Sequence, residues 1–359
     1  MNTTKYQIHT IKNLEETLIK EWKQLWEQAE NATIFNSYEW FVSCQEVEKF
    51  KEYEIHVCYK DDKLVGLLPL QASYQFGIKV MSVVGKAFLV DTPFLLQTYD
   101  ASLLEHFFKH IITKKNIYLQ KIDNQAASLL QILFPKMFFP LMSVNPYITI
   151  TDDPFASVSP STVSQIKKML RKNPGQFRFE IFDGEIDLEK HLQTMFAVEQ
   201  NSSKKQRSMD IFSKQQNKDF FTAISKNAKK FVRIGFLYYD TIPISYQFGF
   251  LCSKEFIAYQ TSYLNEYRKL RPGKTMLFHL LQSLKEQVRI IDLGGGISAY
   301  KQEFTPDYHF LYDMYYSRNL FIMLWWKFIN IVRRLKQIIF PQKFTQDHRF
   351  LFKPYSLQK

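Results

Sequence analysis

Apolar positions recur along this chain with two different periods. Spacings of three and four residues predict amphipathic helices, for example from Leu14 to Ala29 and from Leu188 to Glu199. Alternation of apolar and polar residues predicts strands, and two pairs of these strands are joined by short polar turns, Asp61-Asp62 and Asp240-Thr241. Each turn, together with its flanking strands, predicts a β-hairpin.

The two halves of the chain repeat this order. Each half runs through helices, a hairpin with an aspartate at its turn, further strands and another helix. In segments 59–70 and 238–248, an aromatic strand end precedes the turn, and the returning strand contains Pro or Gly. This repetition predicts a duplicated α/β fold. We expect domains over residues 1–152 and 153–317, followed by a separate segment over 318–359.

Composition narrows the class of protein. The chain has 359 residues, of which 46% are hydrophobic, which excludes a disordered or low-complexity protein. Its three cysteines form no C-x-x-C pair, so neither a disulfide framework nor a zinc ribbon is expected. The first residues lack the apolar run of a signal peptide, and no stretch reaches the roughly 18 apolar residues of a membrane span. We therefore expect a cytoplasmic protein.

Positive charge is concentrated in two segments. The net charge is +12, and residues 201–233 and 310–359 each carry nine Lys or Arg against two Asp. Such segments are typical of proteins with a polyanionic partner: a nucleic acid, an anionic membrane surface or a phosphate-rich cofactor. A solvated basic face is the alternative.

The last predicted helix, over residues 319–340, is basic and amphipathic. Its apolar residues fall in one broad arc that includes Trp325, while Lys327, Arg333 and Lys336 lie on the other side. A helix of this kind can lie on an anionic membrane, which would place the protein peripherally at the inner face of that membrane. Packing of the arc over the core or a sister subunit is the alternative.

The segment from Phe256 to Phe304 carries the candidate chemistry. It reads as strand, basic loop, helix and strand, and the helix begins at Pro272 after two arginines. A helix N-terminus offers unpaired N–H groups and the positive end of a dipole, so it is suited to phosphate. The residues expected to bind a phosphate-bearing cofactor are Arg268, Arg271, Gly273, Lys274 and Thr275.

Three interpretations of this segment compete. A nucleotide-binding P-loop needs a glycine five residues before Gly273, but Arg268 stands there. A methyltransferase would use the Gly-rich run 290–297, yet only about sixty residues follow it, too few for the remaining βα units. The third interpretation is the pyrophosphate loop of an acyl-CoA-dependent transferase.

The order of elements and motifs resembles the double-domain, Fem-like branch of the GNAT acyltransferase superfamily. That branch includes acetyltransferases associated with cellulose and exopolysaccharide synthesis. The family's phosphate loop aligns with residues 268–273, with Arg271 in place of its first glycine. The remaining similar residues are Trp40, Gly66-Leu-Leu-Pro-Leu70, Glu199 with Ser203-Lys204, Tyr263 and Tyr300-Lys301.

The resemblance implies two tandem GNAT-like domains with mixed sheets. It further implies that the second half binds acetyl-CoA, or another acyl-CoA, and that the first half is a degenerate copy that shapes the acceptor site. The acceptor would be a small-molecule or sugar-linked amine, or a hydroxyl, in polysaccharide or cell-envelope metabolism. No metal is expected: His106 and His110 have a ligand spacing, but no Glu stands where an H-E-x-x-H motif needs it.

Acyl transfer assigns provisional roles to individual side chains. Glu199 is the candidate base for the acceptor, and Tyr263 the candidate proton donor to the departing thiolate. Asp292 ends an apolar strand and is expected to line the site, where Tyr300 and Lys301 would bind the acceptor. Among these, a solvated Glu199 and a packed Tyr263 are the structural alternatives.

Two rival functions remain open. A Fem-type transfer of an aminoacyl group from charged tRNA is encouraged by the basic segment 201–233. The family's long helical arm has no clear room between Asp187 and Phe231, which disfavours that function. The other rival is a catalytically silent, membrane-associated assembly factor that keeps only the fold.

Overall fold

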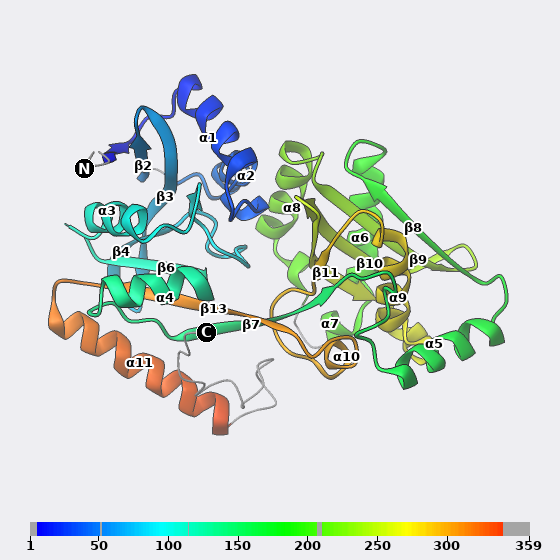
Figure 1. The fold of residues 1–359 in the computed structure, drawn as a ribbon. Helices are drawn as coiled ribbons and strands as arrows, with labels where there is room; N and C mark the ends of the chain where they lie inside the picture. The colour runs from blue at the N-terminus through cyan, green and yellow to red at the C-terminus, as the bar shows by residue number, and fades with distance from the viewer. Residues whose placement is uncertain (1–5, 51, 114, 207–209, 340–359) are drawn as a thin grey trace. The chain divides into compact units, whose positions relative to one another are not determined.

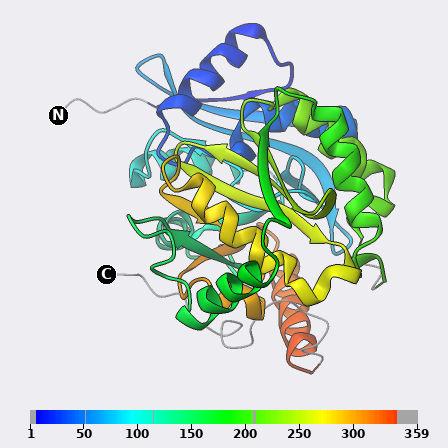
Figure 2. The ribbon, with the colours of Figure 1, turned by 90° about the vertical axis from the view of Figure 1, so that its right-hand side faces the viewer.

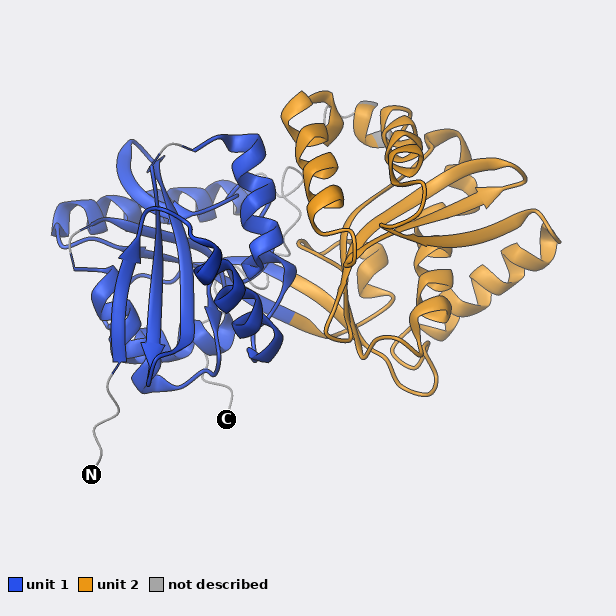
Figure 3. Ribbon diagram, turned by 90° about the horizontal axis from the view of Figure 1, so that it is seen from above, with its two compact units in different colours: residues 1–144, 309–359 blue, residues 145–308 orange. Residues whose placement is uncertain are grey.

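The computed structural model describes residues 6–50, 52–113, 115–206 and 210–339, drawn in Figure 1 and, after a 90° turn, in Figure 2. Two compact units divide the chain (Figure 3). Unit 1 takes residues 1–144 and 309–359, and unit 2 takes residues 145–308. Unit 2 is thus a continuous segment inserted into the chain of unit 1.

Unit 1 is built on a mixed sheet. Its strands β4 and β6 are parallel, whereas its other described pairs are antiparallel. In spatial order the strands are β1 (Tyr6–Ile11), β2 (Tyr53–Lys60), β3 (Lys63–Gln75), β4 (Ile78–Val83), β6 (Ile117–Asp123) and β13 (Tyr308–Tyr316), with β5 (Leu95–Leu96) on β3. Its helices are α1 (Glu16–Gln28), α2 (Tyr38–Glu48), α3 (Ala101–Ile111), α4 (Asn124–Leu133) and α11 (Leu320–Ile339), and η1 (Ile34–Asn36) is a 3₁₀ turn.

Unit 2 repeats this plan. In spatial order its strands are β7 (Leu141–Thr149), β12 (Ile290–Asp292), β11 (Glu255–Tyr263), β10 (Ile242–Cys252), β9 (Val232–Tyr239) and β8 (Phe177–Asp183). Its helices are α5 (Pro160–Lys172), α6 (Leu188–Gln200), α7 (Ser203–Gln206), α8 (Gln215–Asn227), α9 (Pro272–Leu284) and α10 (Ala299–Gln302), with 3₁₀ turns η2 (Ile211–Ser213) and η3 (Asn265–Leu270). Here β11 and β12 are the parallel pair.

The two sheets match strand for strand. Read from β13 to β1, unit 1 places its parallel pair in second and third position, and unit 2 does the same when read from β7 to β8. The duplicated α/β fold expected from the sequence is therefore confirmed. The expected domain boundaries stay a prediction. The compact units are a different division, since they group segments by contact and join residues 309–359 to the first unit.

Most elements lie close to their expected positions. Both hairpins form, and their turns use backbone with positive φ, at Asp61 and Asp62 (49° and 61°) and at Asp240 (54°). Aspartate tolerates this conformation better than most residues do. The last helix ends at Ile339, and residue 340 lies outside the described residues. Strands β1 and β13 and helix α4 were not expected.

Helices cover both faces of the unit 2 sheet. On one face, Leu277 and Leu281 of α9 pack in a core cluster with Phe256 of β11, and α9 crosses the sheet in gold in Figure 2. On the other face, Phe221 of α8 contacts Phe248 of β10, with ring centroids 5.0 Å apart. Aromatic and aliphatic burial on both faces leaves the ends of the strands as the places where polar chemistry can gather.

Candidate functional site

The two parallel strands of unit 2 separate after a short common run. They pair from Glu255 with Ile290 to Ile257 with Asp292, where β12 ends, whereas β11 continues to Tyr263. Just beyond, the amide of residue 264 donates to the carbonyl oxygen of residue 244 on β10, at 2.8 Å. Peptide groups alternate in direction along a strand, so those of residues 261 and 263 point to the opposite edge, beyond the end of β12. On this edge the Lys204 ammonium bonds to the Thr261 carbonyl oxygen, and Ser202 forms an antiparallel bridge with Leu264 just beyond β11. The stretch left for the amides of an extended ligand therefore lies between Ile257 and Thr261.

A β-bulge turns one side chain of β11 toward the site. The register moves from Phe248–Gln260 to Gly249–Ala258 and so skips Tyr259. Ala258 packs in the cluster with α9, but the side-chain amide of Gln260, two residues later, reaches α6 on the other face. Bulges re-aim side chains in this way next to functional sites.

Glu199, at the end of α6, is fully buried. Its Oε2 accepts from the Tyr246 hydroxyl at 2.9 Å, and its Oε1 accepts from Gln260 Nε2 at 3.3 Å. The ammonium of Lys204 lies 3.9 Å from Oε1. Burial, with the nearby Glu199 carboxylate, raises the pKa of the Tyr246 hydroxyl well above its usual value. The Glu199 carboxylate is therefore a buried hydrogen-bond acceptor with fixed partners, and not a solvated side chain of the helix.

Lys204 connects this carboxylate to the open strand edge. Its Nζ donates to the carbonyl oxygen of Thr261 at 2.5 Å. Burial lowers its pKa, while Glu199 and Asp210 act in the opposite direction. The side chain belongs to the short helix α7, so this ion pair and hydrogen bond fix α7 against β11.

Lys301, on α10, holds the glycine-rich loop that follows β12. Its Nζ donates to the carbonyl oxygens of Gly294, Gly295 and Gly296 at 3.1, 3.2 and 3.2 Å. Burial lowers the pKa of Lys301 to about 8; Asp292 opposes this, and Lys204 adds to it. An amine with this pKa is partly neutral near neutral pH.

Asp292 fixes the start of the same loop. It is buried, and its Oδ1 accepts from the amide of Gly294 at 2.5 Å. Gly294 has φ +73°, and a Cβ there would lie 2.9 Å from the carbonyl oxygen of Ala258 on β11. Only glycine fits that conformation so close to a strand.

The start of α9 offers fewer free amides than the sequence suggests. The carbonyl oxygen of Arg271, which has φ 52°, accepts from the amides of Lys274 (3.0 Å) and Thr275 (3.1 Å). Because the first helical residue is a proline, Gly273 supplies the remaining amide. A Cβ on Gly273 would have one neighbour within 4 Å, Tyr263 Cδ1 at 3.9 Å. The backbone there can be approached closely.

The charged side chains of this loop differ in their partners. The Lys274 ammonium pairs with Glu303, and the Arg271 guanidinium donates to Gln165. The Thr275 hydroxyl is buried and bonds to the Arg271 carbonyl at 3.2 Å. Arg268 is exposed. Arg271 is exposed as well but is engaged by Gln165, so both arginines are accessible to a ligand, and Lys274 is only partly so.

The structure brings most of the expected residues together. Glu199 forms an ion pair with Lys204, and Asp292 and Lys301 both bind the backbone of Gly294. Beside the effect of burial, the Asp292 carboxylate raises the pKa of Lys301, and the Lys204 ammonium lowers it. The ring of Tyr263 lies beside Gly273. Burial raises the pKa of the Tyr300 hydroxyl to about 12, with a contribution from Tyr263. The individual catalytic and binding roles stay predictions.

Two residues of the cluster were missed from the sequence. Tyr246 and Gln260 both bind Glu199 from neighbouring strands. The available signal was weak: polar residues such as Ser245, Gln247 and Gln260 interrupt two otherwise apolar strands. Buried polar residues in a strand need partners, which marks such positions as candidates.

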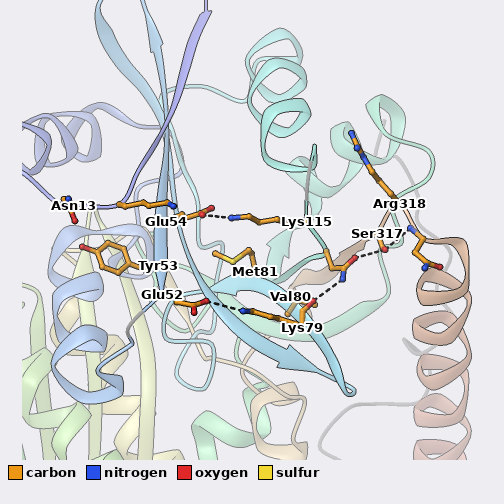
Figure 4. Close-up of a pocket in the computed structure, with 13 residues that line it drawn as sticks. Asn13, Glu52, Tyr53, Glu54, Lys79, Val80, Met81, Lys115, Ser317 and Arg318 are labelled. Atoms are coloured by element: carbon orange, nitrogen blue, oxygen red, sulfur yellow. Dashed lines mark hydrogen bonds and ion pairs between the residues drawn. The ribbon is translucent and has the colours of Figure 1, made fainter.

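A separate pocket lies in unit 1 (Figure 4). Its volume is about 720 Å³. Two of its lysines are paired, Lys79 with Glu52 at 3.3 Å and Lys115 with Glu54. The other lining residues are Lys12, Asn13, Tyr53, Val80, Met81, Asn116, Ser317, Arg318 and Asn319. None of the site residues expected from the sequence lines it.

No helix in the described ranges is long and apolar enough to cross a membrane.

Comparison with known proteins agrees with the observed topology. Residues 160–302, from α5 to α10, match the acetyltransferase (GNAT) domain family. The chain resembles a crystal structure of FemX (TM-score 0.61, 10% identity, 86% of this chain and 97% of that one). No curated protein matches its sequence.

Two further solved structures have similar folds. One is a conserved protein of unknown function from Bacteroides thetaiotaomicron (TM-score 0.58, 10% identity, 87% of this chain and 100% of that one). The other is the C-terminal domain of a putative lysylphosphatidylglycerol synthetase from Agrobacterium fabrum (TM-score 0.54, 10% identity, 84% and 91%). At 10% sequence identity, these similarities are evidence about the fold alone. Together with the GNAT domain in unit 2 and the repeated sheet, they show that the chain has the double-domain, Fem-like fold of the GNAT acyltransferase superfamily.

Proposed function

We propose that unit 2 transfers an acetyl group from acetyl-CoA to an amine or hydroxyl acceptor. The observation that carries this proposal is the separation of β11 from β12 beside the start of α9. The edge of β11 between Ile257 and Thr261, before the carbonyl oxygen that Lys204 holds, would pair with the amides of the pantetheine arm. Gly273 and the exposed Arg268 would meet the pyrophosphate.

The reaction follows from the chemistry of a thioester. The acceptor nitrogen or oxygen attacks the thioester carbonyl carbon, the new bond to carbon forms, and the carbon–sulfur bond breaks. A proton leaves the acceptor to water, the departing thiolate takes a proton from the Tyr263 hydroxyl, and Tyr263 regains its proton from water; the ring of Tyr263 lies beside Gly273. Glu199 is fully buried and fully engaged, so we assign it to positioning β10, β11 and α7, with water carrying the acceptor proton away.

Calorimetric titration with acetyl-CoA tests the proposal. We expect micromolar binding by the wild type and none by Gly273→Trp, because the indole would fill the space in front of the helix start. Gly273 has ordinary negative φ and open surroundings, so the fold should tolerate the change. Ser283→Trp, at an exposed position near the other end of α9, is the matched control and should bind like the wild type. Equal affinity in the two variants would discard the site.

Aminoacyl transfer from charged tRNA is the second candidate. It is supported by the basic segment 201–233 and by the likeness to FemX. If acetyl-CoA does not bind but aminoacylated tRNA does, and salt weakens that binding, aminoacyl transfer is favoured. If neither binds, a non-catalytic assembly factor that keeps only the fold is favoured. A polysaccharide or cell-envelope acceptor is part of our proposal and would be sought by supplying amino sugars once acetyl-CoA binding is measured.

A further inference from the structure

Helix α11 contacts unit 1 through a narrow face. Met323 and Trp326 are buried in a cluster with Val80, Tyr118 and Tyr315, which come from β4, β6 and β13. One turn later Asn330 is also buried, and its Nδ2 donates to the carbonyl oxygen of residue 326 at 2.9 Å. This face fixes the orientation of the helix on its own unit.

The opposite face is apolar and exposed over the length of the helix. At about 100° per residue, its members fall within an arc of about 140°, centred almost opposite Trp326. Phe321 is 81% exposed and Phe328 is 57% exposed. The apolar stripe consists of Leu320, Phe321, Leu324, Trp325, Phe328, Ile331, Leu335 and Ile339. An apolar surface of this extent on a soluble domain marks an interaction site.

The charges beside the stripe are positive. The segment of α11 contains no Asp or Glu. Lys327 and Lys336 are exposed, and each falls about 20° outside one edge of the stripe, so that the apolar surface is bordered by ammonium groups on both sides. Arg318, just before the helix, extends away from α11 and lines the unit 1 pocket, so it is not part of this border (Figure 4).

The aromatic residues of the stripe are suited to an interface between oil and water. Trp325 is 46% exposed, and its Nε1 donates to the carbonyl oxygen of Phe76 at 3.3 Å. Its ring stacks with that of Phe328, with centroids 6.1 Å apart. The indole N–H is therefore satisfied by the protein, and the apolar part of the ring remains outward. Tryptophan is enriched at membrane–water boundaries for its amphipathic character.

We propose that the apolar stripe of α11 lies in the surface of an anionic lipid bilayer. The stripe would enter the acyl region, and Lys327 and Lys336 would meet the lipid phosphates. A second copy of the chain fits less well. Two stripes placed face to face would bring rows of lysines together, and the helix has no carboxylate to compensate them. This proposal does not depend on the reaction of unit 2.

Vesicle flotation of the full chain tests this surface. We expect flotation with vesicles of 30% phosphatidylglycerol in phosphatidylcholine, a decrease with salt, and at least tenfold weaker partition into pure phosphatidylcholine. Phe321→Asp combined with Phe328→Asp should lose at least tenfold in partition, since both side chains are exposed and the fold does not need them. The matched control is Ile132→Asp on α4, a 59% exposed residue outside the stripe, which should float like the wild type.

Each other outcome overturns the proposal. Absence of flotation, equal flotation of the double variant, or equal binding to neutral vesicles would each do so. Sedimentation velocity distinguishes the competing occupant. A dimer that does not float, and that becomes a monomer in the double variant, would show that a second copy covers the stripe.

Discussion

Replacing Glu199 by alanine is expected to destabilise unit 2 through the groups it leaves behind. The change removes the acceptor of the Tyr246 hydroxyl and of the Gln260 amide, and it leaves the Lys204 ammonium without its carboxylate. The new side chain also opens space where a fully buried carboxylate stood. The three partners come from three elements, so we expect β10, β11 and α7 all to become less stable.

The magnitude follows from burial. A buried polar group without a partner costs about 1–3 kcal/mol, and breaking a buried ion pair costs about 3–5 kcal/mol. The Lys204 side chain is 33% exposed and keeps its hydrogen bond to the Thr261 carbonyl oxygen, so the buried-pair figure does not apply to it and most of the cost comes from Tyr246 and Gln260. We expect Glu199→Ala to lower the local free energy of opening by about 3–5 kcal/mol, and Glu199→Gln by less, because the amide oxygen still accepts from Tyr246.

Native-state hydrogen exchange on peptides of β10 and β11 is the suitable assay. Tryptophan fluorescence would not serve, since all five tryptophans (Trp22, Trp26, Trp40, Trp325 and Trp326) lie in unit 1. The matched control is Glu185→Ala, which breaks the exposed pair with Lys229 (2.7 Å, side chains 48% and 55% exposed). Exposed pairs contribute about 0–1 kcal/mol. If Glu199→Ala costs no more than this control, the reasoning about the buried cluster is wrong.

Two further predictions concern other parts of the fold. Gly294→Ala should cost at least ~1 kcal/mol more than Gly175→Ala in urea unfolding followed by circular dichroism; both have positive φ, but only Gly294 would bring a Cβ against Ala258. Equal losses would contradict the packing of the glycine-rich loop on β11. In unit 1, burial raises the pKa of Asp313 from 3.8 to about 6, so its protonated form stabilises the fold below pH 3.8 and this contribution is lost as the pH rises to about 6. Between pH 4 and 7, Asp313→Asn should therefore gain up to ~3 kcal/mol over the wild type, measured by urea unfolding followed through tryptophan fluorescence; a constant difference would refute it.

Local signals account for what could be predicted from the sequence. Asp61 at positive φ and the alternation on either side of it define a hairpin within a few residues, and the same holds for the turn at Asp240. Long-range pairing has no such local signal. Strand β13 pairs with β6, beginning with Leu311 and Asp123, although nearly all of unit 2 lies between these two strands in the sequence. The apolar arc of the last helix was visible, but the face that contacts the core was not, because it rests on Met323 and Trp326, which lie outside the exposed stripe.

The candidate site divides in the same way. The basic loop before α9 and the glycine-rich loop after β12 are contiguous motifs, so their residues could be identified in advance. The partners of Glu199 depend on the bulge at Tyr259, which decides the face that Gln260 occupies. A bulge is one extra residue in a pairing register, and that register exists only once two strands have met.

The insertion of unit 2 into unit 1 has a consequence for synthesis. A ribosome releases residues 145–308 as one continuous stretch, so unit 2 can fold as soon as it has emerged. The sheet of unit 1 lacks β13 until residue 316 has emerged, and until then β6 presents an unpaired edge with the apolar Leu119 and Ile122 beside it. The unit that begins first is thus finished last, and the nascent chain must keep that edge from pairing with a neighbour while the rest is made.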